Sequence, residues 1–410
     1  MFVIIAGLTF VNAIILTNGL GAAGRGAVAT AYGATIVFGW AFQFGLPASA
    51  AYYAKDLEHS DILNAAWRMC VVGAIPFALL LTPFYLWQFN GIAFEEGGQS
   101  LKLWYLAFVA VHIVQSPFQS AVFYLRGVGS TVMFNVLLAA PQLLITLGYA
   151  VLYLTGNLTV TSALASTMIM MTSGWIIALT ASGSWPSIGL KTEHFTTIRN
   201  YALRSWVGSL SFIISLRVDQ MLLVGFVDLS DLGIYAVAAA LATLSSPVAR
   251  AISQSLQPFI RHAATDQERL ARIRRSLRWT VMASLAVLVP LGLTADFFIP
   301  IVFGDEFSAS VRPLLILLPG AFASDINQIF ATALAGFNKP EKASRAQVYS
   351  AIATVIGLLA LLGPYGIVGA AITSSIAYSV GAISTGLFWR SLAREVRAGR
   401  MTGTTVPVAV

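Results

Sequence analysis

The sequence predicts an all-α membrane protein with about 12 transmembrane helices, arranged as two pseudo-symmetric six-helix lobes around a central cavity. Three observations predict this class. Of the 410 residues, 57% are hydrophobic and only 10% are charged, whereas a soluble domain carries about 25% charged residues; the mean hydropathy is +0.79. Apolar stretches long enough to cross a bilayer follow one another along the chain. Finally, the two halves share weak sequence similarity.

The composition also excludes several classes of protein. Disordered, collagen-like and disulfide-stapled chains are excluded, because the apolar content is high and Cys70 is the only cysteine. The net charge of +7 does not indicate a nucleic-acid partner, because there is no basic arm, zinc-ligand spacing or soluble domain to hold one. The glycines at 19–24 have the spacing of a dinucleotide fingerprint, but no strand precedes them.

A helix that crosses the hydrocarbon core needs about 20 mostly apolar residues. We expect spans at residues 2–20, 27–53, 64–87, 102–125, 131–154, 160–182, 203–226, 232–260, 279–303, 311–336, 346–363 and 366–389. The first is expected to be a retained helix rather than a signal peptide, because no basic segment precedes its apolar run. Prolines inside these spans are tolerated where neighbouring helices satisfy the freed backbone groups.

Lys and Arg residues favour a topology with both termini in the cytoplasm. Eighteen of the 24 Lys and Arg residues lie in the even-numbered connections and the tail, whereas three, Arg25, Lys102 and Arg312, lie on the opposite side. The predicted domains are an N-terminal lobe at 1–190, a C-terminal lobe at 191–400 and a cytoplasmic tail at 401–410. The arginine-rich segment 262–278 is predicted to be an amphipathic helix lying on the cytoplasmic leaflet, where it would attract anionic headgroups or simply anchor the topology.

Two short motifs recur in the two halves at the same sequence offset. Gly24-x-x-Ala-Val-Ala-x-Ala recurs from Gly233, and Gln119…Leu-x-Gly recurs from Gln328. Because six spans separate the copies, both halves enter the membrane from the same side, which predicts a parallel repeat with a cavity between the halves.

Polar side chains inside the spans predict the lining of this cavity. On the eighth span the polar residues recur on one helix face, which would be costly against lipid. The candidate substrate-contacting residues are Arg217, Arg250, Ser246, Ser253, Gln254, Gln257, Gln119, Gln328, His112 and Arg25. Alternative interpretations are hydrogen bonding between helices for the polar stripes and His112, an interhelix ion pair for Arg217, and snorkelling to the membrane surface for Arg25.

No motif for covalent chemistry can be singled out. The sequence has no glycine-rich phosphate loop, no His/Cys metal spacing and no Ser/His/Asp constellation. The predicted outer loops are short, and the longest is about 88–101. We therefore expect a transporter rather than an enzyme, with no metal and no cofactor.

Several segments resemble a known family of membrane proteins. The run LGAAGRG at 20–26, followed by an Ala-rich span ending in FGLP at 44–47, resembles the first hairpin of bacterial polysaccharide-biosynthesis proteins. The segments RVDQMLL at 217–223, LGIYAVA at 232–238 and IVFGDEF at 301–307 are similar to later parts of the same family. These proteins are lipid-linked oligosaccharide flippases of the multidrug/oligosaccharidyl-lipid/polysaccharide exporter superfamily, and the resemblance covers essentially the whole chain.

The resemblance implies two lobes in a V shape, with alternating access to a cationic cavity. Its substrate would be a polyprenyl-diphosphate-linked repeat unit of O-antigen, other lipopolysaccharide or exopolysaccharide, flipped from the cytoplasmic to the outer leaflet of the bacterial inner membrane. Arg217 and Arg250 would bind the diphosphate, and Arg25 matches the family's outer-hairpin arginine. Asp219 or Asp325 would carry a coupling H⁺ or Na⁺. Membrane lipids, a polysaccharide polymerase and glycosyltransferases of the pathway would be partners.

Three alternatives remain open. A drug or cation antiporter of the same superfamily would need acidic cavity residues and an apolar pocket. A lipid II flippase would share the fold and the diphosphate. A membrane glycan polymerase or ligase, which is an enzyme, would need a large outer loop with catalytic polar residues.

Overall fold

The computed structural model describes residues 2–73, 107, 117–183, 194–223, 225–262, 265–337 and 339–398, and within some helices it describes the backbone alone. Throughout these ranges the regular structure is helical, without strands. This confirms the predicted all-α class. Most of the third and fourth predicted spans, 64–87 and 102–125, lie outside the described residues.

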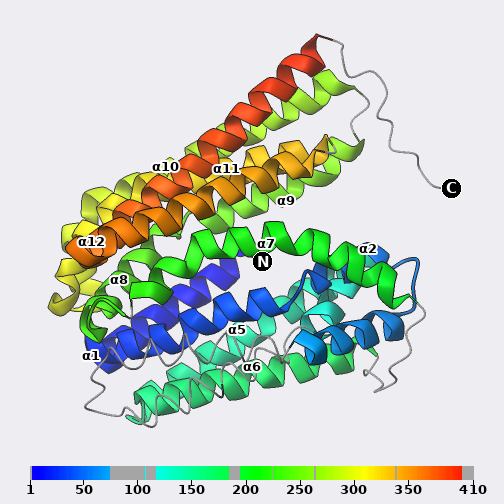
Figure 1. Ribbon diagram of the computed structural model, residues 1–410. Helices are drawn as coiled ribbons and strands as arrows, with labels where there is room; N and C mark the ends of the chain where they lie inside the picture. Colours follow the sequence, from blue (N-terminus) through cyan, green and yellow to red (C-terminus); the bar gives the residue numbers. More distant parts are fainter. Residues whose placement is uncertain are drawn as a thin grey trace.

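The first half of the chain forms one bundle (Figure 1). Its helices are α1 (Phe2–Phe42), α2 (Leu46–Tyr53), the helical residues 59–73 and 117–127, α5 (Thr131–Leu154) and α6 (Val160–Ser182). Both α5 and α6 have the predicted bounds. Two helices meet within α1 at Gly21, whose φ of 67° lies in the left-handed region that favours glycine, so α1 contains the whole first predicted span and part of the second.

The second half continues with seven further elements. These are α7 (Phe195–Leu223), α8 (Leu229–Ala242), α9 (Ser246–His262), α10 (Asp266–Phe303), the short 3₁₀ helix η1 (Asp305–Ser310), α11 (Val311–Gly336) and α12 (Pro340–Arg397). In α12 the chain turns at Gly366, and Ser350 Oγ donates to the Ala377 carbonyl at 2.8 Å across the resulting hairpin. The last two predicted spans therefore form a single hairpin.

Among the described residues, six helices are long and apolar enough to cross a membrane, and a seventh is added if the bent pair α8–α9 counts as one span. The bend of 41° in that pair divides the predicted span 232–260. The predicted span 27–53 is divided as well, because Gly45 adopts a left-handed conformation with φ 72° and a new helix begins at Leu46, with Pro47 in its first turn.

The prediction for segment 262–278 is partly wrong. The segment is helical, but from Asp266 onward it is collinear with the next span in the 38-residue helix α10. Its apolar side chains Leu270, Ile273 and Leu277 pack against the ends of α9, α11 and α12. Because the protein itself covers this apolar face, the helix does not need to lie flat on the membrane.

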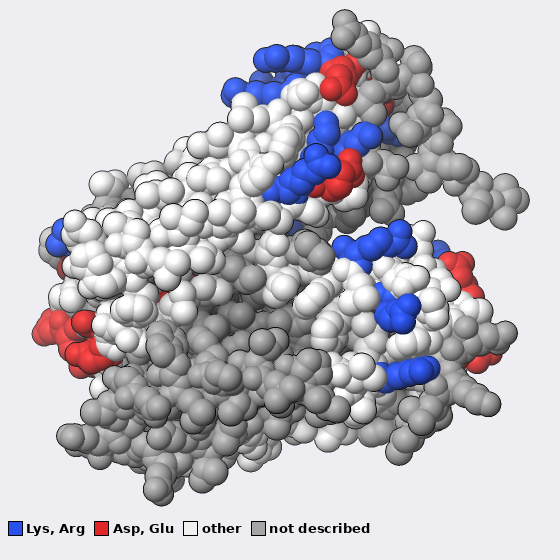
Figure 2. All heavy atoms as spheres, viewed as in Figure 1, with Lys and Arg blue, Asp and Glu red and all other residues white. Residues whose placement is uncertain are grey.

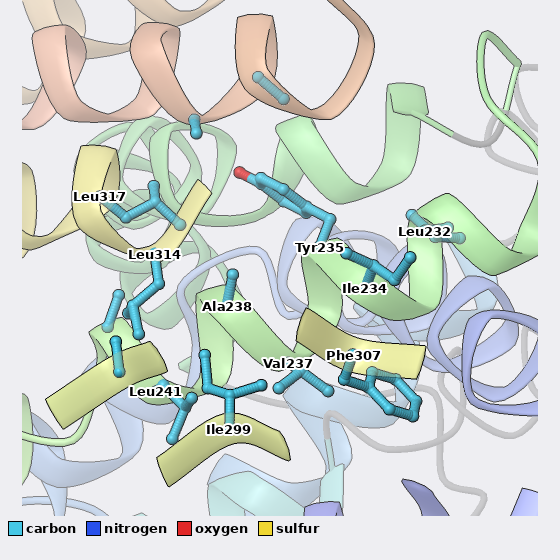
Figure 3. Close-up of a cluster of buried hydrophobic side chains, with 14 of the residues drawn as sticks. Leu232, Ile234, Tyr235, Val237, Ala238, Leu241, Ile299, Phe307, Leu314 and Leu317 are labelled. Carbon is cyan, nitrogen blue, oxygen red and sulfur yellow. The ribbon is translucent and has the colours of Figure 1, made fainter. Parts of the chain in front are cut away.

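The two bundles meet at one end of the molecule and separate at the other. A shared core joins α1 residues Ala13 and Ala22 to α8, α10, α11 and α12. In this core Tyr235, Val237 and Leu241 of α8 lie against Ile299, Phe307, Leu314 and Leu317 (Figure 3). At the other end the ends of α9–α12 form one separate core around Ile273 and Trp389, while α2, residues 62–69 and the start of α7 form another.

The two ends of the molecule differ in the charge of their surface residues. Figure 2 shows most of the visible Lys and Arg where the bundles separate, interspersed with some Asp and Glu, and a cluster of Asp and Glu where the bundles meet. We call them the basic end and the acidic end. The acidic end includes Asp228 and Asp231 at the start of α8 and Asp305 and Glu306 in η1. Helix α7 links the bundles: Ile198 and Ala202 pack on α2, whereas Leu222 and Leu223 pack in the shared core.

Candidate functional site

A cavity of about 630 Å³ lies between the bundles. Most of its wall comes from the first bundle, from α1, α2, residues 118–126, α5 and α6, while α9 of the second bundle contributes Arg250 and Gln254. The volume is in the range of small-molecule sites, which are about 300–1,000 Å³. The cavity therefore belongs to both bundles, as expected for a central cavity.

The polar lining of this cavity is cationic and rich in amides. Its charged members are Arg126 and Arg250, which come from different bundles. Glutamines complete the polar set: Gln43, Gln119, Gln142 and Gln254. Among the described lining residues there is no Asp or Glu. Such a surface suits an anionic ligand with many hydroxyl groups, since guanidinium binds phosphate and amides both donate and accept hydrogen bonds.

Aromatic side chains form much of the remaining wall. Phe118 and Trp175 stack with ring centres 5.4 Å apart, and Phe123 meets Phe134 edge to face at 5.4 Å. The guanidinium carbon of Arg126 lies 5.7 Å from the centre of the Phe134 ring. A cation over an aromatic face is attracted by the ring quadrupole, so Phe134 helps to hold Arg126 at the cavity.

The predicted polar stripe on α9 divides between two environments. Arg250 and Gln254 are exposed and line the cavity. Ser253 is instead buried against α11, where its hydroxyl pairs with Thr332 Oγ1 at 2.5 Å and lies 3.4 Å from the Gln328 carbonyl. Ser246 lines a second, much smaller pocket of about 30 Å³ together with Asp219.

Of the other six candidate residues, one lines the large cavity, two are absent from its described lining, and three lie outside the described residues or have side chains that are not described. Gln119 lines the cavity from the helix 117–127. The half-buried residues Gln328 on α11 and Arg25 on α1 are not among its described lining. His112 and the side chains of Arg217 and Gln257 lie outside the described residues.

Both predicted ion-coupling carboxylates are buried within the second bundle. Asp219 is 3% exposed, and its Oδ2 accepts hydrogen bonds from Tyr235 Oη at 2.5 Å and Ser374 Oγ at 2.8 Å. Asp325 is fully buried, and its Oδ2 accepts from Ser284 Oγ at 2.7 Å.

Both carboxylates lie close to the α8–α9 bend. Asp219 lines the small pocket together with Thr243 and Ser246, and Asp325 lies beside Ser245 and Ser246. Arg250 of the cavity wall lies near enough to influence the Asp325 carboxylate electrostatically, which links this buried group to the cavity-lining side of α9. In the described part of the chain, no group of three or more His, Cys, Asp or Glu side chains is placed to hold a metal ion.

Sequence reasoning missed Arg126, Gln43 and Gln142. Arg126 directly follows the fourth predicted span, 102–125, where the sequence indicates a connecting loop. Gln43 and Gln142 are amides inside predominantly apolar spans. Their intramembrane position was a usable signal, because polar side chains within spans usually face a cavity or a neighbouring helix.

Comparisons with known proteins agree with this architecture. A sequence profile of the family described as polysaccharide biosynthesis protein matches residues 26–312. The probable low-salt glycan biosynthesis flippase Agl15 of Haloferax volcanii is 23% identical over 389 residues, which cover 92% of this chain and 79% of that protein.

Two solved structures share the fold over nearly the whole chain. An inward-facing multidrug resistance MATE family transporter of the MOP superfamily aligns with a TM-score of 0.76 at 13% identity, covering 97% of this chain and 96% of the transporter. The lipid II flippase MurJ, in an inward closed conformation, aligns with a TM-score of 0.70 at 14% identity, covering 94% of this chain and 87% of the flippase.

Proposed function

Because the chain belongs to the polysaccharide biosynthesis protein family, we propose that it is a flippase for a lipid-linked glycan. Its substrate is a polyprenyl-diphosphate-linked oligosaccharide, which it moves from the cytoplasmic to the outer leaflet by alternating access. A glycan headgroup does not cross hydrocarbon unaided, since its polar groups would lose their hydrogen bonds. A polar cavity that opens to each side in turn removes this barrier without covalent chemistry.

One observation carries the proposal: arginines from both bundles line one cavity that has no described carboxylate. Arg126 and Arg250 supply two positive charges for the diphosphate. A ligand that binds both residues draws the two bundles together at the basic end, which favours closure of that side. Arg217, whose backbone lies in α7, is a further candidate for this charge.

The glutamines and the aromatic wall suit the sugars. Amide groups of Gln119 and Gln254 pair with hydroxyls, and the faces of Phe118 and Trp175 accept the C–H edges of sugar rings. Of the remaining candidates, Gln257 and His112 stay assigned to the substrate path, whereas the contacts of Ser253 favour a role in holding α9 on α11. Gln328, Ser246 and Arg25 are assigned to the path in other states of the cycle.

Asp219 and Asp325 are proposed to carry the coupling cation, H⁺ or Na⁺. Each is buried and hydrogen-bonded by hydroxyls, and Asp325 interacts with Arg250. Neutralising Asp325 would release Arg250 from an electrostatic competitor and leave it available to the diphosphate. In this way an ion bound in the second bundle changes the affinity of the cavity for its substrate.

The charged ends of the molecule support an orientation. We assign the basic end and both termini to the cytoplasm of a plasma (inner) membrane, in keeping with the positive-inside rule. In this orientation the present structure opens inward. The proposed lobes are residues 1–190 and 191–400, and the expected pathway partners are glycosyltransferases and a polymerase that makes O-antigen or exopolysaccharide.

The charge of the cavity lining and the identity of the transported glycan distinguish the proposed function from its rivals. A cation or drug antiporter would present carboxylates to its ligand, whereas both buried carboxylates here lie outside the described lining of the large cavity. A lipid II flippase shares the diphosphate and differs in the sugars, so transport of different glycans must distinguish it.

Restoration of surface polysaccharide in a strain that lacks the gene tests the proposal. We expect Arg250→Ala and Arg126→Ala to abolish restoration at native abundance in the membrane. The matched control is Arg345→Ala, because Arg345 is exposed at the start of the α12 hairpin and lies outside the described cavity lining. Full restoration by both cavity variants would contradict the proposed function.

A further inference from the structure

Six exposed arginines lie at the basic ends of α10 and α12. They are Arg274, Arg275, Arg278, Arg390, Arg394 and Arg397. We propose that these residues, here called the arginine collar, bind the headgroups of anionic phospholipids in the leaflet at the basic end. The inference does not depend on the proposed flippase activity.

The exposed face of α10 gives the position of the membrane boundary. Trp279 is 53% exposed, Leu293 is 78% exposed and Ile301 is 81% exposed, so this face is suited to lipid. The rise from Trp279 to Ile301 is about 33 Å, close to the hydrocarbon thickness of about 30 Å. A Trp at such a boundary is typical of the membrane interface. Arg275 and Arg278 follow on the basic side of Trp279, at headgroup depth.

The last part of α12 gives the same boundary independently. Exposed apolar side chains at Ile383 and Leu387 continue directly into Arg390, Arg394 and Arg397 at helical spacing. From the turn at Gly366 to Leu387 the helix rises about 32 Å, again close to the hydrocarbon thickness. Two helices of one bundle thus change from apolar to arginine-lined at the same level of the bilayer.

No ion pair between described residues neutralises a collar arginine. Among the described residues, ion pairs are made by Arg269 with Asp266 and by Arg272 with Glu268, on the preceding turns of α10. Neither pair includes a collar residue. Glu395 is the acidic residue beside the α12 part of the collar, and the patch remains strongly positive.

The position of the collar favours a lipid over a soluble partner. The apolar face of the first turns of α10 is buried in the protein, so the segment presents its arginines and not a hydrophobic docking face. The arginines lie on the same helix faces as the exposed apolar side chains that contact the acyl chains, closer to the basic end. The anionic groups nearest to them are therefore phospholipid headgroups. Each Arg near an anionic membrane surface contributes about fivefold in affinity.

Quenching of tryptophan fluorescence by brominated lipids tests the inference on the full-length protein in mixed bilayers. We expect brominated phosphatidylglycerol to bind at least about fivefold more tightly than brominated phosphatidylcholine, with the preference falling as salt rises. Arg274→Gln/Arg275→Gln/Arg278→Gln should remove most of the preference, and Lys at the same three positions should retain it. Arg312→Gln, an exposed arginine at the acidic end, is the control and should behave as wild type.

Three outcomes would overturn the inference. One is equal binding of the two lipids by the wild-type protein, a measurement that requires no variant to fold. Another is an unchanged preference in both the triple Gln variant and the corresponding variant of Arg390, Arg394 and Arg397. The third is a loss of preference in Arg312→Gln as large as that in the triple variant.

Discussion

Gly26 of α1 and Gly233 of α8 cross so closely that neither position has room for a side chain. A Cβ atom on Gly26 would collide with the Leu229 carbonyl, and one on Gly233 would collide with the Ala22 carbonyl. This crossing lies at the acidic end, where the bundles share a core. In the proposed cycle these two backbones must part when the cavity opens to the other side.

Substitution at this crossing should loosen the acidic end. We expect Gly233→Ala to lower the free energy of unfolding by about 1–3 kcal/mol, the usual cost of overpacking. It should also speed labelling of a cysteine introduced at Asn18, whose amide donates to the Val302 carbonyl at 3.1 Å. Gly7→Ala is the matched control, since a Cβ at Gly7 meets nothing within 4 Å. Equal stability and labelling in the two variants would show that the crossing does not hold this end closed.

The two environments on α9 predict different effects of substitution. Ser253→Ala removes the hydrogen bond to Thr332 and should lower the free energy of unfolding by about 0.5–1.5 kcal/mol while transport per folded molecule is retained. Arg250→Ala should abolish transport per folded molecule, even though it also removes a positive charge near the buried Asp325. Thermal unfolding in detergent and transport by the same preparations separate the two effects, and the reverse pattern would be inconsistent with the assignment of Arg250 to the ligand.

The buried acceptor Asp219 should show energetic coupling to Tyr235. Removing one partner of a buried hydrogen bond leaves the other unsatisfied, at a cost of about 1–3 kcal/mol. We expect Asp219→Asn and Tyr235→Phe each to destabilise the protein and the double variant to cost less than the sum. A double-mutant cycle of unfolding free energies measures this coupling. Strict additivity would mean that the contact contributes no interaction energy.

The aromatic side chains of the cavity wall should contribute to transport by stacking on the substrate, and not only by filling space. Trp175→Phe should keep most of the transport, whereas Trp175→Leu should reduce it about two- to tenfold, the range given by an aromatic contact of 0.5–1.5 kcal/mol. The stacked neighbour Phe118 provides the same comparison with Phe118→Leu. Initial transport rates at matched protein abundance decide the point, and equal rates for Phe and Leu at position 175 would exclude stacking on the substrate.

The sequence predicted the fold class and several helices closely. Hydropathy alone located α5, α6 and α11, because these helices are uninterrupted and strongly apolar. It did not predict the break at Gly45 or the bend between α8 and α9, where local turns interrupt an apolar run. Such turns depend on neighbouring helices, and those contacts are not visible in a hydropathy pattern.

The candidate site was predicted only in part, for a geometric reason. Helical spacing placed Arg250, Ser253 and Gln254 on one broad face, but only the packing of α9 on α11 determines which of them reaches the cavity. Arg126 was missed because an arginine at the end of a span has the same sequence signature as a loop anchor. Its position beside Phe134 becomes evident only when α5 is packed against the preceding helix.

Movement of a fluorescent polyprenyl-diphosphate-linked oligosaccharide across vesicles that contain the purified protein tests the central claim most directly. The account predicts translocation by the wild-type protein and by Arg345→Ala, and its loss in Arg126→Ala and Arg250→Ala at equal protein content. Retained translocation in both cavity variants, or none by a folded wild-type protein, would contradict it.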